Sequence, residues 1–213
     1  MKREVAIVVG KTGFGKSLWG QLYARLWPRR LIYDPTSTYR AEYLPPEEII
    51  DRVANKETKS FAFAVSDPEY VPALGLLAYG RGDNLLVLEE ASTFFPKGQS
   101  RLDEWARQLV FMGRHQRCSL LFVAQRATSI PIDVRSQANR IVSFQQHEPD
   151  DVRTLSEFFG KERAELIPNL PKLECFDFHN GDTMRYSIRR SVEHDLGIRL
   201  DIEPESVYTF IRS

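Results

Sequence analysis

The sequence predicts an α/β fold in which helices flank a mainly parallel, twisted sheet. Short aliphatic runs alternate with helix-compatible segments along most of the 213 residues, and this alternation implies parallel strands joined by right-handed crossovers. The first aliphatic run leads directly into a glycine-rich segment and then a helix. Late in the chain, His179-Asn180-Gly181-Asp182 separates two strand-like runs, which is a hairpin signal. We therefore expect a parallel sheet with a C-terminal β-hairpin.

The individual elements follow from residue type and spacing. Residues 5–9 are apolar and mostly β-branched, and 84–89 and 119–124 are nearly unbroken aliphatic runs, which indicates strands buried on both faces. The helix expected over 101–116 has apolar residues spaced three and four apart. We expect further strands at 31–33, 60–65 and 140–144, helices at 17–26, 45–54, 72–79 and 151–159, a helical turn at 162–166, and hairpin strands at 173–178 and 183–188. The tail from Ser191 gives no clear pattern.

Size and composition limit the function classes. We expect one domain over 1–213, with a core at about 3–160 and a helix and hairpin extension at about 161–213. Lys plus Arg equals Asp plus Glu at 29 each, so the net charge is zero and gives no global sign of nucleic-acid binding. Cys118 and Cys175 lack metal-ligand spacing and are expected to be buried thiols. No signal peptide or membrane-spanning stretch stands out, so we expect a cytoplasmic protein with no integral membrane segment.

A complete phosphate-binding motif follows the first strand. Residues 10–17 fit G-x-x-x-x-G-K-[ST] and read Gly10-Lys11-Thr12-Gly13-Phe14-Gly15-Lys16-Ser17. The glycines let successive backbone N–H groups point at an anion, and the following helix adds its positive end. Lys16 is expected to reach the β- and γ-phosphates, and the Ser17 hydroxyl to bind Mg²⁺. The predicted cofactors are therefore ATP and Mg²⁺.

Polar residues end two of the predicted aliphatic strands. Glu89 and Glu90 follow 85–88, and Gln125 follows 120–124. Strand carboxyl ends meet at the edge that also carries the phosphate loop. We assign Glu89 to the metal, Glu90 to the base that polarises the attacking water, and Gln125 to the γ-phosphate or the water. The alternative is that these residues are ordinary solvated strand ends.

Arginines near the next crossover are candidates for a finger inserted into a neighbouring subunit's site. Arg114 and Arg117 close the predicted helix, and Arg140 is a weaker candidate. A guanidinium stabilises charge that develops in phosphoryl transfer. The alternative is a basic helix end that interacts favourably with the helix dipole.

Together these residues resemble the HerA/FtsK superfamily of P-loop ATPases. Residues 113–126 are similar to the family pattern of G-R-x-x-G, an apolar residue, S/H-L, and a strand ending in Q-R. The matching positions are Gly113, Arg114, Ser119, Leu120, Gln125 and Arg126. Two shorter segments, Asp34-Pro35 with Tyr39 and Asn139-Arg140-Ile141 with Phe144, also look like family segments. The resemblance covers residues 5 to about 159.

The chain departs from the family pattern at two positions. Arg117 stands where the family usually has Gly, and Glu89 stands where the acidic strand usually ends in Asp. Glutamate is one methylene longer than aspartate, so contact with Mg²⁺ through water can differ. Glu90 still matches the family's catalytic acid.

The resemblance implies a P-loop NTPase fold of the RecA-like, additional-strand type and a homo-oligomeric ring, typically a hexamer, that moves double-stranded DNA. The chain has none of the extra domains of cellular HerA or FtsK, which favours a viral genome-packaging ATPase acting in the host cytoplasm or at the virion vertex, with a capsid vertex or portal protein as partner. The open alternatives are a cellular HerA-like or conjugation-type DNA motor, and a nucleotide-dependent switch or morphogenesis protein without motor activity.

Overall fold

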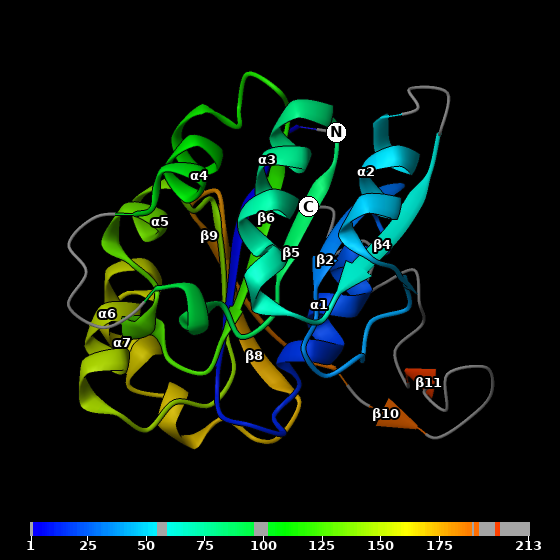
Figure 1. Cartoon of the computed structure of the whole chain (residues 1–213). Helices are drawn as coiled ribbons and strands as arrows, with labels where there is room; N and C mark the ends of the chain where they lie inside the picture. The colour runs from blue at the N-terminus through cyan, green and yellow to red at the C-terminus, as the bar shows by residue number, and fades with distance from the viewer. Residues whose placement is uncertain (1, 55–58, 96–101, 189, 192–198, 201–213) are drawn as a thin grey trace.

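One nine-stranded sheet organises the protein (Figure 1). The computed structural model describes residues 2–54, 59–95, 102–188, 190–191 and 199–200. The strand order is β3-β4-β2-β5-β6-β1-β7-β8-β9, with parallel pairing from β3 to β7 and antiparallel pairing for β7–β8 and β8–β9. The strands are β1 (Val5–Val9), β2 (Arg29–Tyr33), β3 (Glu42–Tyr43), β4 (Phe61–Val65), β5 (Leu85–Leu88), β6 (Ser119–Ala124), β7 (Arg140–Ser143), β8 (Glu174–His179) and β9 (Asp182–Ser187). The predicted fold class is confirmed.

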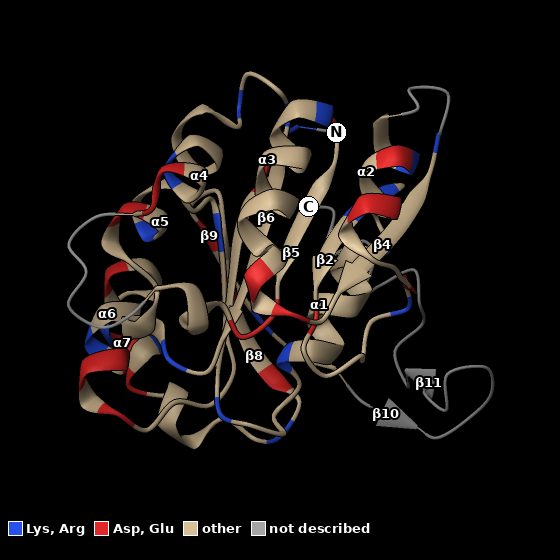
Figure 2. Cartoon of the chain, viewed as in Figure 1, with Lys and Arg blue, Asp and Glu red and all other residues tan. Residues whose placement is uncertain are grey.

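Helices pack on both faces of this sheet. They are α1 (Lys16–Ala24), α2 (Pro46–Ala54), α3 (Val71–Arg81), α4 (Glu104–Arg107), α5 (Ile132–Gln137), α6 (Pro149–Phe159) and α7 (Lys161–Ala164). Two further short strands, β10 (Arg190–Ser191) and β11 (Arg199–Leu200), pair with each other. In the described residues no helix is both long and apolar enough to cross a membrane. Figure 2 shows acidic and basic residues intermingled along these elements, in keeping with the balanced composition.

Alternating side chains divide the core into two layers. Val5, Ile7 and Val9 of β1 pack in a cluster with buried residues of α2, α3 and α6, whereas Ala6 and Val8 pack in a second cluster with residues of α1. This period of two is the ordinary geometry of a strand. Because both faces are covered, β1, β5 and β6 are buried along their whole length, which explains their uninterrupted apolar sequence.

The hairpin and the two cysteines agree with expectation. Asn180 and Gly181 have φ angles of 51° and 101° and form a two-residue connection between β8 and β9. Both residues need positive φ in this turn, which is why the Asn-Gly pair predicted it. The strands lie one residue away from the predicted bounds. Cys118 and Cys175 are buried free thiols.

The helix expected over 101–116 is shorter. Residue 101 lies outside the described residues, and α4 continues into a π-helical turn that ends at Met112. Gly113 keeps a helical backbone and its N–H donates to the Leu109 carbonyl oxygen at 3.1 Å, while a Cβ at this position would lie 2.3 Å from that oxygen. Arg117 then adopts a φ of 52°, in the region that favours glycine, at the position where the resembled family has Gly. Sequence periodicity also missed β3 and α5, which are short.

Candidate nucleotide-binding site

The phosphate loop joins β1 to α1 and is packed tightly against the segment after β7. Gly10, Gly13 and Gly15 have φ angles of 152°, 80° and 120°. A Cβ on Gly10 would lie 2.5 Å from the Phe144 Cβ, and one on Gly15 would lie 2.9 Å from the Phe144 ring. The backbone N–H of Lys11 donates to the Gln145 carbonyl at 2.8 Å. The glycines therefore provide both the loop's conformation and its close packing, as a phosphate cradle requires.

Lys16 begins α1 and is only 7% exposed. Its Nζ donates to the Lys11 carbonyl oxygen at 3.3 Å, so the ammonium lies under its own loop. Burial lowers the pKa of Lys16, while the negative charges of Glu90 and Glu89 oppose that shift. A buried ammonium beneath a glycine-rich loop, at the start of a helix, is placed to bind an anion.

Ser17 and Glu89 meet at the carboxyl edge of the sheet. The Ser17 hydroxyl donates to Glu89 Oε1 at 2.7 Å, and the Tyr39 hydroxyl donates to Glu89 Oε2 at 2.9 Å. Glu89 is 4% exposed, and burial raises its pKa, although both hydrogen bonds act in the opposite direction. The two oxygen-donor residues that were predicted to bind Mg²⁺ are thus brought together from β5 and α1.

These oxygens fit magnesium chemically. Mg²⁺ prefers hard oxygen ligands and is usually held by one or two protein groups together with substrate phosphates. Across the described ranges, no group of three or more His, Cys, Asp and Glu residues could hold a metal ion. Ser17 and Glu89, beside the glycine-rich loop, therefore fit a Mg²⁺ site in which the protein supplies one or two oxygen ligands and nucleotide phosphates supply others.

Glu90 leaves the strand in a strained conformation. Its backbone is left-handed, with φ 51° and ψ 46°, and this conformation is uncommon for residues other than glycine and asparagine. Gln125, which follows the adjacent strand β6, places Nε2 at 3.3 and 3.4 Å from the two Glu90 carboxylate oxygens. The structure thus brings Glu90 and Gln125 together beside Glu89.

The three arginine candidates lie in different surroundings. Arg114 is exposed in the turn before β6, at the edge that carries the amino ends of the parallel strands, opposite the phosphate loop. Arg117, in the same turn, forms an ion pair with Asp83. Arg114 therefore does not contact its own phosphate loop, and its role stays a prediction.

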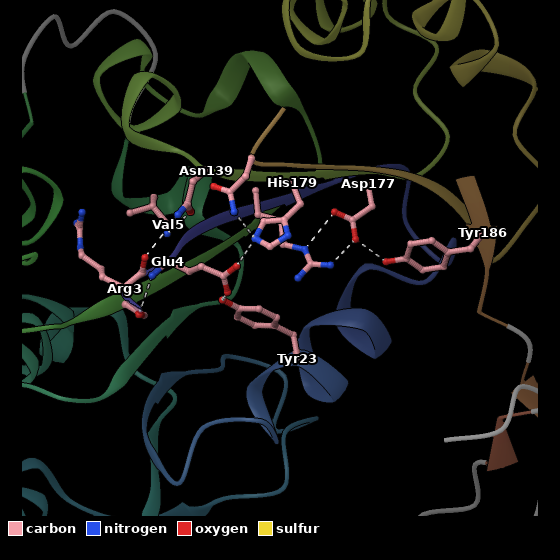
Figure 3. A network of polar contacts seen from close by, with 11 residues as sticks. Arg3, Glu4, Val5, Tyr23, Asn139, Asp177, His179 and Tyr186 are labelled. Carbon is pink, nitrogen blue, oxygen red and sulfur yellow. Dashed lines mark hydrogen bonds and ion pairs between the residues drawn. The ribbon is translucent and has the colours of Figure 1, made fainter. Parts of the chain in front are cut away.

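Arg140 is fully buried inside the chain. Its Nε and Nη2 donate to the two Asp177 carboxylate oxygens at 3.0 and 2.7 Å, and its guanidinium lies 5.3 Å from the centre of the Trp19 ring. Tyr186 also donates to Asp177, at 2.8 Å (Figure 3). A guanidinium enclosed in this way is not presented to a neighbouring subunit. These contacts favour a structural role for Arg140 over the predicted catalytic one.

Tyr39 is the site residue whose position was not foreseen from the sequence. The segment from Asp34 to Tyr39 was noted only for its resemblance to a family motif. In the structure the Tyr39 hydroxyl donates a hydrogen bond to Glu89, which lies 50 positions later in the chain. The motif is the only sequence signal for this residue, and it carries no information about the partner.

Comparison with known proteins shows what this fold is similar to. No family model and no curated protein matches the sequence. Among solved structures, the genome packaging NTPase B204 from Sulfolobus turreted icosahedral virus 2, in complex with AMPPCP, has a TM-score of 0.69 at 19% identity over 88% of this chain and 98% of that one. The chain has the fold of this NTPase. The predicted resemblance is thereby confirmed at the level of structure.

Two conjugation proteins share the fold more distantly. VirB4 of Thermoanaerobacter pseudethanolicus matches with a TM-score of 0.59 at 10% identity, over 88% of this chain and 89% of that one. The pCW3 conjugation coupling protein TcpA, solved with ATPγS, matches with a TM-score of 0.55 at 13% identity, over 98% of this chain and 65% of that one.

Proposed function

We propose that this chain is a Mg²⁺-dependent ATPase that moves double-stranded DNA and packages a viral or phage genome into a preformed capsid. The observation that carries the ATPase part is the convergence of Ser17, Glu89 and Glu90 beside a close-packed phosphate loop. The packaging part is supported by the likeness to B204, which extends over nearly all of that protein.

Each site residue has a role that its position supports. The loop amides and Lys16 bind the phosphates of ATP, while Ser17 and Glu89 hold the metal. Mg²⁺, when bound, neutralises charge on the β- and γ-phosphates. Glu90 accepts a proton from the attacking water, and Gln125 orients that water or contacts the γ-phosphate. The contact between Gln125 Nε2 and the Glu90 carboxylate, at 3.3 and 3.4 Å, supports a shared role for these two residues.

A homo-oligomeric ring, most simply a hexamer, would complete the site. Arg114 is exposed and remote from its own loop, so in a ring it can reach the site of the adjacent subunit. The ring would also bring one surface of every subunit to a common channel. Even a chain of zero net charge can line that channel with basic side chains and hold duplex DNA by its phosphates. A capsid vertex or portal protein would be the docking partner, in the host cytoplasm or at the virion vertex.

A conjugation-type or cellular DNA motor is the second candidate. The likeness to VirB4 and TcpA favours it, because both share the fold over most of this chain. A nucleotide-dependent switch without motor action is the third possibility, and DNA dependence of the ATPase separates it from the first two.

The test is the ATPase rate with duplex DNAs of unrelated sequence, at low and then raised salt. Contacts to phosphates predict stimulation by every duplex and its steep loss with salt. Lys16→Ala, which removes the buried ammonium, is the control that should no longer bind nucleotide. An assembled protein whose ATPase ignores DNA would contradict the motor and leave the switch. Copurification with capsid proteins would separate packaging from conjugation.

A further inference from the structure

The loop between β2 and β3 delivers one buried side chain to the metal-side carboxylate. Tyr39 is 4% exposed and Glu89 is equally buried, and their side chains meet at 2.9 Å between Oη and Oε2. The other Glu89 oxygen is occupied by the Ser17 hydroxyl at 2.7 Å. If Ser17 turns its oxygen toward a metal, the Tyr39 hydroxyl is the partner that stays on Glu89.

Two features fix Tyr39 in this position. Asp34 accepts the backbone N–H groups of Thr38 and Tyr39 and the Tyr43 hydroxyl on one oxygen, at 2.6, 2.7 and 2.7 Å. Its other oxygen accepts the N–H and hydroxyl of Thr36. These bonds fold the loop into a closed turn around one carboxylate, so the backbone of Tyr39 has little freedom.

The second feature is a glycine in α1. A Cβ on Gly20 would lie 2.3 Å from the Tyr39 hydroxyl oxygen and 3.5 Å from its ring carbon. Glycine inside a helix costs roughly 0.5–1 kcal/mol relative to alanine, so helix stability alone does not call for it. The missing side chain gives the hydroxyl its space between α1 and Glu89.

We propose that Tyr39 is a positioning residue for the metal site, which orients the Glu89 carboxylate toward Mg²⁺ through its hydroxyl, and that Gly20 is glycine in order to admit that hydroxyl. The inference rests on the proposed function, because it needs a Mg²⁺–nucleotide complex at this loop. Partners that orient a metal ligand typically change metal affinity by about 10- to 100-fold when removed.

The experiment measures binding of ATPγS by calorimetry, in EDTA and across a Mg²⁺ series. Tyr39→Phe keeps the ring and removes only the hydroxyl. We expect the Mg²⁺ concentration at half-saturation to rise about 10- to 100-fold, with affinity in EDTA unchanged. Tyr23→Phe is the matched control, because it removes a buried tyrosine hydroxyl of α1 that donates to Glu4 and contacts neither Glu89 nor Asp34. It should leave the Mg²⁺ dependence as in the wild type.

Gly20→Ala provides an independent arm. Its methyl group should push the Tyr39 hydroxyl from Glu89 and raise the Mg²⁺ requirement in the same direction. In combination with Tyr39→Phe it should add no further shift, because the oxygen that the methyl meets is gone.

The outcomes separate this inference from the proposed function. A wild-type protein without Mg²⁺-dependent ATPγS binding overturns both. Wild-type binding with an unchanged Mg²⁺ requirement in Tyr39→Phe overturns the positioning role alone. If Tyr39→Phe loses ATPγS affinity equally in EDTA and in Mg²⁺ and also melts at a lower temperature, Tyr39 serves only the stability of the fold. That result would also overturn the positioning role.

Discussion

Two buried carboxylates associated with the same sheet differ in the charge of the groups that donate hydrogen bonds to them. Glu89, after β5, accepts hydrogen bonds from two neutral hydroxyls, those of Ser17 and Tyr39. Asp177, in β8, accepts two hydrogen bonds from the Arg140 guanidinium and a third from Tyr186. Figure 3 shows Asp177 next to Tyr186, and elsewhere in the same network Glu4 links His179 to Tyr23 of α1.

The difference shows which carboxylate is ready to take a cation. Neutral donors stabilise Glu89 without cancelling its charge, and burial accordingly raises its pKa. A bidentate arginine already neutralises Asp177, and its removal would leave a buried charge. The two carboxylates therefore differ in the charge of their hydrogen-bond partners, which are neutral hydroxyls for Glu89 and a guanidinium for Asp177.

The contrast extends to the arginines, and Arg114 should give the largest effect. Arg114→Ala is expected to fold normally and bind ATP, but its turnover should fall about 10³–10⁵-fold. This is the effect of removing an arginine that a neighbouring subunit inserts into a phosphoryl-transfer site. Steady-state ATPase assays check this, with Arg117→Ala as the matched control from the same exposed turn. Mixing Arg114→Ala with Glu90→Gln should restore part of the activity, since a mixed ring can join an intact Arg114 to an intact Glu90. Assembled mixed rings without recovery would argue against action between subunits.

Glu90 should matter for turnover and not for binding. Glu90→Gln keeps the shape of the side chain and removes its basicity, so ATP should bind and persist, with turnover lowered about 10²–10⁴-fold. Single-turnover hydrolysis measured beside ATP binding separates the two steps. Near-normal turnover in this variant would remove Glu90 from the proposed mechanism.

Arg140 should matter for stability and not for chemistry. Arg140→Met leaves the Asp177 carboxylate buried without its cation, which costs about 3–5 kcal/mol. Urea unfolding measures this loss, and adding Asp177→Leu should recover much of it because no buried charge remains. A variant of wild-type stability that is nevertheless inactive would instead return Arg140 to its predicted catalytic role.

Asp34 offers a smaller, pH-dependent effect. Burial acts to raise the pKa of Asp34, but hydrogen bonds from the Tyr39 backbone, Tyr43 and Thr36 outweigh it and lower the pKa. A lowered folded-state pKa gives stability that is present above the unfolded value of about 3.9 and is lost as pH falls through the folded value. Asp34→Asn should thus lower the free energy of unfolding by roughly 1.5 kcal/mol at pH 7. The difference from the wild type should shrink as the pH falls. Urea midpoints at several pH values test this, and a difference independent of pH would contradict it.

The sequence predicted the parts of the site that depend on local pattern. The phosphate loop has fixed spacing, and Glu89, Glu90 and Gln125 end aliphatic strands, so strand order alone brings them to one edge. Their assigned roles stay predictions, although the geometry brings the residues together.

The sequence did not predict the features that depend on contacts between residues far apart in the chain. Arg140 was a candidate finger because nothing in the sequence links it to Asp177, 37 positions later. Tyr39 follows β2 and reaches Glu89 after the neighbouring strand β5, and the helix over 101–116 ends in a π-helical turn at Met112. Periodicity reports which face of an element is buried and not which polar group it meets there.

Matched amide substitutions at the two carboxylates test the contrast most directly. Glu89→Gln and Asp177→Asn each replace a buried carboxylate by an amide of the same shape, and ATPγS binding is followed against Mg²⁺ beside thermal unfolding. We predict that Glu89→Gln loses the Mg²⁺-dependent part of the affinity without melting earlier. Asp177→Asn should melt at a lower temperature and keep the wild-type Mg²⁺ dependence. A Glu89→Gln protein that responds to Mg²⁺ as the wild type does would contradict the account.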